Sequence, residues 1–365
     1  MNYAPAEVLP AGEHLADELE ARGWTQAELA EILGRPAQFV SEIISGKKEI
    51  TRESAAQIAA ALGTSAEVWL NLQDSYFLWK QGRDQATQDE LGEVRLRARL
   101  NDLAPMSVLR KRGIVTSTST QGQVEEVKAL FKLNDITDEP QLRIAARRGN
   151  GSEALTPTQN AWLACVERVL PAAPTVDYSA TKLEALARIV SQIVRKPSGL
   201  ALLPAAYAEA GVRLVYVEAF PSSKLSGASF QLEDGPVIAL SGLRHRLDIV
   251  LFTLLHETAH VIRGDIDKCD GPIIDDEDRP HTLGDDDQAD VLAAEWVLPS
   301  VLPTTHGRIS TDWVEQVANE MQVHPIVVIG RLQKSGSLPW RTALVKDAPS
   351  AVPYLQTWSS SVFAD

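Results

Sequence analysis

The stretch LLHETAHVI, residues 254–262, carries two histidines four positions apart, with a glutamate directly after the first. In a helix, side chains four residues apart lie on one face, so His256 and His260 can each present a ring nitrogen to one metal ion. Glu257 lies about 100° around the helix from His256. It is therefore placed to hold a water molecule as general base, the arrangement of an H-E-x-x-H zinc site.

The flanking residues are apolar at helical spacing and predict a largely buried helix from about residue 243 to residue 263, closed by Gly264. These apolar residues are Leu247, Val250, Leu251, Leu254, Leu255 and Val261. A lone histidine on such a face is usually a satisfied core residue. Two histidines with an interposed glutamate are costly to bury without a metal ion, so the pattern favours a zinc site.

A third ligand is expected from a following helix, and DDDQADVLAAEWVLPS at 285–300 is the candidate. Its apolar residues share one helix face, and its acidic residues fall in the first turn, where the helix dipole favours negative charge. The alternative is that these acids are only a solvated helix start.

Strand-like patterns precede the metal motif. VRLVYV at 212–217, SGASF at 226–230 and PVIAL at 236–240 predict a small sheet, with the turn signal EDG between the last two. SGASF is the candidate edge strand for an extended peptide, with Gly227, Ala228 and Ser229 as substrate-binding residues, because Gly227 permits close backbone approach. A plain structural strand is the alternative.

Together these segments resemble the ImmA/IrrE-like metallopeptidase family over about residues 200–340. The matching stretches are LSGASF (225–230), PVIALSG (236–242), FTLLHETAHVI (252–262), DDQADVLAAEWVLP (286–299) and VHPIVVIGRLQ (323–333). The resemblance implies an α+β zincin-like (gluzincin) domain with a Zn²⁺ cofactor, in which Glu257 is catalytic.

The same resemblance implies that Asp286 is the third ligand and that Asp290 is a hydrogen-bond partner of a ligand histidine. The family usually has Glu where this chain has Asp286, and the shorter side chain puts that ligand in doubt; Asp285 and Asp287 are neighbours that could replace it. The acidic loop at 264–284 is interpreted as a flap or substrate-selecting rim, in which His281 contacts substrate or is merely exposed.

At the other end, WTQAELAEILGRPAQFVSEIISGKKEIT at 24–51 predicts two short helices joined by a tight turn. Thr25 and Glu28 form a capping box for the first helix. This is the helix-turn-helix layout, whose second helix enters the major groove of DNA. The residues expected to contact DNA are Gln38, Ser41, Glu42, Ser45, Lys47 and Lys48.

This region resembles the HigA-type antitoxin branch of the XRE helix-turn-helix family over about residues 9–80, most specifically at LGTSAEVWLNLQ (62–73). The resemblance implies a five-helix domain that dimerises and binds palindromic operator DNA. Residues 1–80 hold six Lys/Arg and twelve Asp/Glu, but segment 35–52 holds four basic residues against two acidic ones. A local positive face on an acidic domain predicts modest non-specific affinity for DNA. The alternative is a bundle that only dimerises or holds a partner.

The whole chain fits this organisation. Its 365 residues, 44% hydrophobic, predict more than one domain, and its net charge of −14 argues against a general nucleic-acid coat protein. Two distant cysteines, no signal-peptide pattern and no membrane-length apolar run favour the cytoplasm. The fold class expected is mainly α with a small β-sheet: a helix-turn-helix domain at 1–82, a helical linker region at 83–199, the peptidase domain at 200–345 and a loosely ordered tail at 346–365.

Three functions follow. The first is a cytoplasmic transcriptional regulator whose zinc metallopeptidase domain cleaves a regulatory protein, such as a repressor or the chain itself. The second is a DNA-binding antitoxin or repressor whose peptidase-like domain senses a ligand or metal without cutting, favoured by Asp286 and by the absence of an obvious tyrosine near the site. The third is an N-terminal domain that chiefly neutralises a toxin protein.

Overall fold

The computed structural model describes residues 7–140, 155–267, 272–276, 285–298, 300–303 and 309–358, with the backbone alone for residues 275, 276 and 285–287. The chain divides into two compact units, Met1–Arg95 and Leu96–Asp365. The predicted boundaries at 82/83, 199/200 and 345/346 stay predictions. None of the helices in the described ranges is long and apolar enough to cross a membrane.

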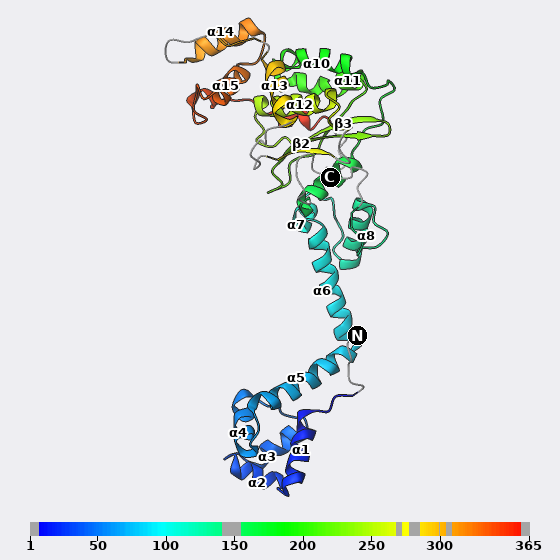
Figure 1. The fold of residues 1–365 in the computed structure, drawn as a ribbon, viewed down its shortest axis with the longest axis vertical. Helices are drawn as coiled ribbons and strands as arrows, with labels where there is room; N and C mark the ends of the chain where they lie inside the picture. The colour runs from blue at the N-terminus through cyan, green and yellow to red at the C-terminus, as the bar shows by residue number, and fades with distance from the viewer. Residues whose placement is uncertain are drawn as a thin grey trace. The chain divides into compact units, whose positions relative to one another are not determined.

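The N-terminal unit contains the five predicted helices, which Figure 1 shows in blue to cyan. They are α1 (Ala11–Arg22), α2 (Gln26–Ile32), α3 (Ala37–Ile44), α4 (Arg52–Leu62) and α5 (Ala66–Arg83). Their common core is apolar and centres on Leu15, Leu29, Val40, Ile58 and Trp69. A long helix, α6 (Gln85–Leu103), spans the division between the two units.

The local sequence determines where the two helices of the helix-turn-helix, α2 and α3, begin and end. The Thr25 hydroxyl accepts from the Glu28 backbone N–H at 3.2 Å, and the Glu28 carboxylate accepts from the Thr25 N–H at 2.7 Å, so the predicted capping box begins α2. Gly34 adopts a φ of 64° just after α2, a conformation that costs glycine little. Pro36 then precedes the first residue of α3.

The C-terminal unit is built on a four-stranded sheet in the order β1-β3-β2-β4. The strands are β1 (Arg213–Tyr216), β2 (Leu225–Leu232), β3 (Gly235–Leu240) and β4 (Ile273–Asp276). β1 pairs parallel with β3, whereas β2 pairs antiparallel with both β3 and β4. The first three strands lie where the sequence patterns predict them.

Helices cover both faces of this sheet. Alternate strand residues divide between two cores: Leu214 and Ile238 belong to one, and Val215 and Val237 to the other. The first core packs under α10 (Ala180–Ile193), α11 (Leu203–Ala208), α12 (Leu247–Ile262) and α13 (Asp285–Val297), which Figure 1 shows on one side of β2 and β3. Helices α14 (Thr311–Met321), α15 (Pro325–Lys334) and α16 (Val352–Leu355) add to that core.

The second core is supplied by the region predicted to be a helical linker. It contains α7 (Met106–Lys111), α8 (Thr120–Phe131), α9 (Pro157–Arg168) and the end of α6. Trp162 on α9 is fully buried, and its indole N–H donates to the Val217 carbonyl at 2.8 Å, next to β1. The end of α6 and helices α7, α8 and α9 therefore form one wall of the C-terminal unit.

Two arginines of this region, Arg99 and Arg112, hold loops in place by hydrogen bonds to backbone carbonyls. Arg99 donates to the backbone carbonyls of residues 136, 137 and 138 at 2.8–3.2 Å. Arg112 donates to the carbonyls of Glu218 and Ala219 at 2.7 and 2.6 Å, and stacks on Phe220. Guanidinium groups suit this role because their N–H groups form a fixed fork.

The expectation of a loosely ordered tail is wrong for residues 346–358. Ala351 and Leu355 are fully buried, and the Trp358 indole donates to the Leu200 carbonyl at 2.8 Å. The composition is rich in Ser, Pro and Val, but these apolar side chains complete the core beside α12.

Gly12 on α1 gives a test of the N-terminal packing. A Cβ at this position would lie 2.5 Å from the Ile43 carbonyl oxygen and 2.7 Å from that of Ile44, at the end of α3. Backbone cannot move aside as a flexible side chain can, so we expect Gly12→Ala to destabilise this unit by about 1–3 kcal/mol. Hydrogen exchange of the α1–α5 amides in the full chain measures the change.

The matched control is Gly82→Ala on α5, where an added Cβ meets nothing within 4 Å. The control is expected to stabilise α5 by up to about 1 kcal/mol, because alanine is the better helix former. Equal protection of α1–α5 in Gly12→Ala and the unsubstituted chain would contradict the close packing of α1 on α3.

Candidate functional site

Helix α12 brings the two predicted ligand histidines together. The Nε2 atoms of His256 and His260 lie 3.1 Å apart, and the rings meet edge to face with centroids 4.7 Å apart. Both residues are buried, with exposed fractions of 6% and 1%. The Nε2 atoms of the two histidines are therefore directed at the same place.

A carboxylate lies behind each imidazole. Asp290 Oδ1, on α13, is 2.9 Å from His256 Nδ1. Asp265 Oδ2 is 3.1 Å from His260 Nδ1 and also accepts from Arg263 Nε at 2.8 Å. A carboxylate bonded to Nδ1 fixes the ring orientation and directs Nε2 outward, as behind metal-bound histidines. Asp290 therefore contacts His256, while the role of His256 as a metal ligand stays a prediction.

Asp265 was not identified from the sequence as a partner of His260. Its position depends on the turn that ends α12, where Gly264 has a φ of 66° and the Asp265 N–H donates to the His260 carbonyl at 3.0 Å. This left-handed closure turns the chain back over the last helical turn. The signal that could have identified Asp265 is an acidic residue directly after a helix-ending glycine, five positions after His260.

The third predicted ligand is placed only by its backbone. Asp286 lies in the first turn of α13, four residues before Asp290, so the two share a helix face. The side chains of Asp285, Asp286 and Asp287 lie outside the described residues. Among the side chains that are described, no group of three His, Cys, Asp or Glu is arranged to hold an ion.

Glu257, the predicted general base, lies under the sheet. It is fully buried, and a Cβ built on Gly227 of β2 would be 2.9 Å from its Oε1 atom. The absence of a side chain at 227 therefore leaves the room in which this carboxylate sits. The sequence predicts that a peptide backbone approaches Gly227 closely, whereas the group that lies against Gly227 is the side chain of Glu257.

The prediction that residues 226–230 form an edge strand is wrong. Gly227, Ala228 and Ser229 pair with β3 on one side and with β4 on the other. Ala228 and Ser229 are also fully buried. Since both backbone edges are used, these residues cannot receive a peptide as an added strand. Strand β2 is an interior strand because β4 pairs with it, and β4 forms inside residues 264–284, the segment interpreted as a flap. His281 of that segment lies outside the described residues.

The predicted DNA-contacting residues gather on and just after α3. Gln38, Ser41, Ser45, Lys47 and Lys48 are exposed. Glu42 is half-buried between two of them.

Glu42 accepts from Gln38 Nε2 at 2.7 Å and pairs with Lys48 Nζ at 3.0 Å. The hydrogen bond from Lys48, followed by that from Gln38, lowers the pKa of Glu42, so this carboxylate stays charged and holds Lys48 on the surface of the domain.

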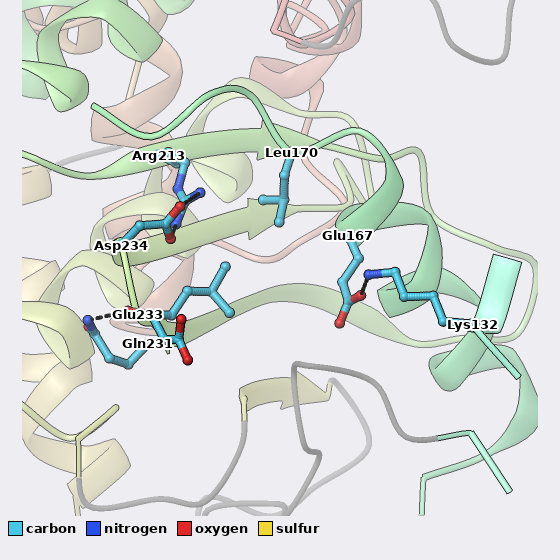
Figure 2. A pocket seen from close by; sticks show the side chains of 8 residues that line it. Lys132, Glu167, Leu170, Arg213, Gln231, Glu233 and Asp234 are labelled. Atoms are coloured by element: carbon cyan, nitrogen blue, oxygen red, sulfur yellow. Dashed lines mark hydrogen bonds and ion pairs between the residues drawn. The ribbon is translucent and has the colours of Figure 1, made fainter. Parts of the chain in front are cut away.

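A hollow of about 490 Å³ lies elsewhere in the C-terminal unit, and Figure 2 shows its lining. Its charged groups face one another: Lys132 pairs with Glu167 at 2.5 Å, and Arg213 Nη1 donates to Asp234 at 3.1 Å. None of the residues predicted for catalysis or metal binding lines it.

Comparison with known proteins gives matches to the N-terminal unit. The sequence model of the helix-turn-helix family matches residues 15–69. The chain is 37% identical over 67 residues to an uncharacterized HTH-type transcriptional regulator, YbaQ, of Escherichia coli K12, covering 18% of this chain and 59% of that one. It is 44% identical over 69 residues to antitoxin HigA-1 of Vibrio cholerae, covering 19% and 65%.

Among solved structures, the chain is 30% identical to the Pseudomonas aeruginosa antitoxin HigA with higBA promoter, covering 23% of this chain and 92% of that one with a TM-score of 0.22. The chain spans 59–79% of the length of the curated relatives it matches. Through its N-terminal domain, the chain belongs to the helix-turn-helix family.

Proposed function

We propose that the chain is a transcriptional regulator that binds operator DNA through its N-terminal domain and hydrolyses a peptide bond in a regulatory protein through a zinc site in its C-terminal unit. The observation that carries the enzymatic part is the convergence of His256 and His260 to 3.1 Å between Nε2 atoms, with a carboxylate behind each ring.

The donor set fits a zinc ion. Neutral imidazole nitrogens are preferred zinc ligands, and Asp290 and Asp265 orient the rings that would hold it. Asp286 would supply the third ligand from α13. A zinc ion bound there would supply Lewis acidity to a peptide carbonyl.

Glu257 is the residue that moves the proton. Its carboxylate follows His256 directly and is confined between α12 and Gly227 of β2. In this position it would take a proton from an attacking water molecule and deliver it to the leaving amine. The room left by Gly227 accommodates this carboxylate without a clash.

The DNA-binding part rests on the family and on the exposed residues of α3. Ser41, Ser45 and Lys47 face solvent, where base edges or phosphates can reach them. The sequence similarity to an HTH-type transcriptional regulator supports an operator as the partner.

We also propose that the N-terminal unit forms a homodimer, as palindromic operators require. Helix α5 supports this, because it exposes three large apolar side chains: Val68 by 47%, Phe77 by 36% and Leu78 by 68%. Light scattering of the full chain should give twice the 39.8 kDa of one chain. A mass of 39.8 kDa at the concentration that saturates operator DNA would contradict the dimer.

A second candidate is a DNA-binding antitoxin or repressor whose peptidase-like unit senses a metal or ligand, or binds a toxin, without cutting. The similarity to antitoxin HigA-1 and the Asp at 286 favour it. The two candidates differ in whether the zinc-loaded chain cleaves any peptide.

Glu257→Gln separates chemistry from metal binding. The amide keeps the size of the carboxylate but cannot accept the proton, so we expect cleavage to fall by about 10²–10⁴-fold while zinc content is unchanged. The zinc-loaded full chain is incubated with a mixture of synthetic peptides and with itself, and products are read by mass spectrometry.

A variant that cuts at the rate of the unsubstituted chain would contradict the role of Glu257. If the unsubstituted chain, carrying zinc, cuts neither the peptides nor itself, the second candidate replaces the first.

Glu42→Gln tests the surface of α3. The change removes a negative charge and releases Lys48, so we expect tighter binding to a random-sequence duplex and a salt dependence steeper by about one phosphate contact. Fluorescence anisotropy at several salt concentrations gives both quantities.

The control is Glu67→Gln on α5, which changes the net charge equally and lies off α3. An equal gain in affinity for the two variants would show that net charge, rather than the Glu42–Lys48 pair, sets binding.

A further inference from the structure

A second, smaller cavity of about 170 Å³ lies in the C-terminal unit between α12, α13 and α15. Its walls are largely apolar. They are formed by Ile249, Phe252, Ala294, Val297 and Val327, and Trp340 stands at its rim, 56% exposed. No residue proposed above for zinc binding or proton transfer lines this cavity.

The cavity continues the helix faces that carry the candidate zinc site. On α12, Phe252 lies one turn before His256, and their rings stack with centroids 6.2 Å apart. On α13, Ala294 lies one turn after Asp290, which contacts His256. A ligand in the cavity would therefore be separated from His256 by the Phe252 ring.

The rim of the cavity is basic. Arg331 and Lys334 of α15 are exposed, and the described residues form no ion pair with either. Lys334 Nζ lies 5.6 Å from the centre of the Phe252 ring, over the apolar wall. An apolar wall beside such cations suits a ligand with an apolar body and a negative end.

Asp248, the acidic residue in the lining, does not repel a bound anion. Asp248 accepts from Arg246 Nε and Nη2, both at 2.7 Å. Burial, the largest influence, raises the pKa of Asp248, while Arg246 acts in the opposite direction. In either protonation state the pair carries no net negative charge, so the cations at the rim are not cancelled.

We propose that this cavity binds a compact carboxylic acid with an aromatic or aliphatic body, the body lying against Phe252 and Val297 and the carboxylate meeting Lys334 and Arg331. The charge of the rim selects the carboxylate, and the volume limits the body to about the size of one large side chain. This ligand site is separate from the proposed peptidase chemistry and does not depend on it.

The test uses three probes of one shape: 3-phenylpropionate, 3-phenylpropanol and 3-phenylpropylamine. Each is titrated into the full zinc-treated chain by calorimetry, with Trp340 fluorescence as a second readout. We expect the carboxylate to bind at least about tenfold more tightly than the amine, with the alcohol between them. Lys334→Gln combined with Arg331→Gln should abolish the preference for the carboxylate.

Ala294→Leu fills the cavity from a helix position that accepts leucine readily. It should remove binding of the carboxylate, whereas Val291→Leu, at a position on the same helix that is 58% exposed, should leave binding unchanged. The proposal is overturned if no probe binds, if the amine binds as tightly as the carboxylate, or if Ala294→Leu binds like the unsubstituted chain. Binding by an apolar peptide alone, without binding of the free acid, overturns it as well.

Discussion

The C-terminal unit depends on the burial of three polar side chains within one apolar helix. His256, Glu257 and His260 are each 6% exposed or less, and their neighbours on α12 are apolar. Removing such groups from water is costly unless each meets a partner. The carboxylates of Asp290 and Asp265 meet the two rings, and Gly227 leaves space for Glu257.

Several other features serve this arrangement. The turn at Gly264 returns Asp265 to His260, and α13 brings Asp290 against His256. One face of the sheet packs against α12, and its other face is covered by the end of α6 and by α7, α8 and α9. The strand that carries Gly227 is therefore held from both faces of the sheet. Positioning of this kind is what a preorganised catalytic or metal site requires.

The sequence predicted the parts that local chemistry determines. Helical spacing located α12 and α13, capping residues located α2, and alternating patterns located β1, β2 and β3. Long-range partners were not predictable in the same way. The apolar residues of α6–α9 indicated helices but not the sheet face they cover, and the acidic composition of residues 264–284 concealed β4, whose pairing makes β2 an interior strand. Asp265 was missed because its place depends on a backbone turn.

A helix-turn-helix domain and a candidate hydrolytic site in one chain suit a regulator that acts on DNA and on a protein. The most direct test of this account is the zinc content of the purified full chain, with His260→Ala and Asp286→Ala alongside. The account predicts about one zinc ion per chain, lost in His260→Ala and reduced in Asp286→Ala. A folded chain that holds no zinc when the ion is supplied would contradict it.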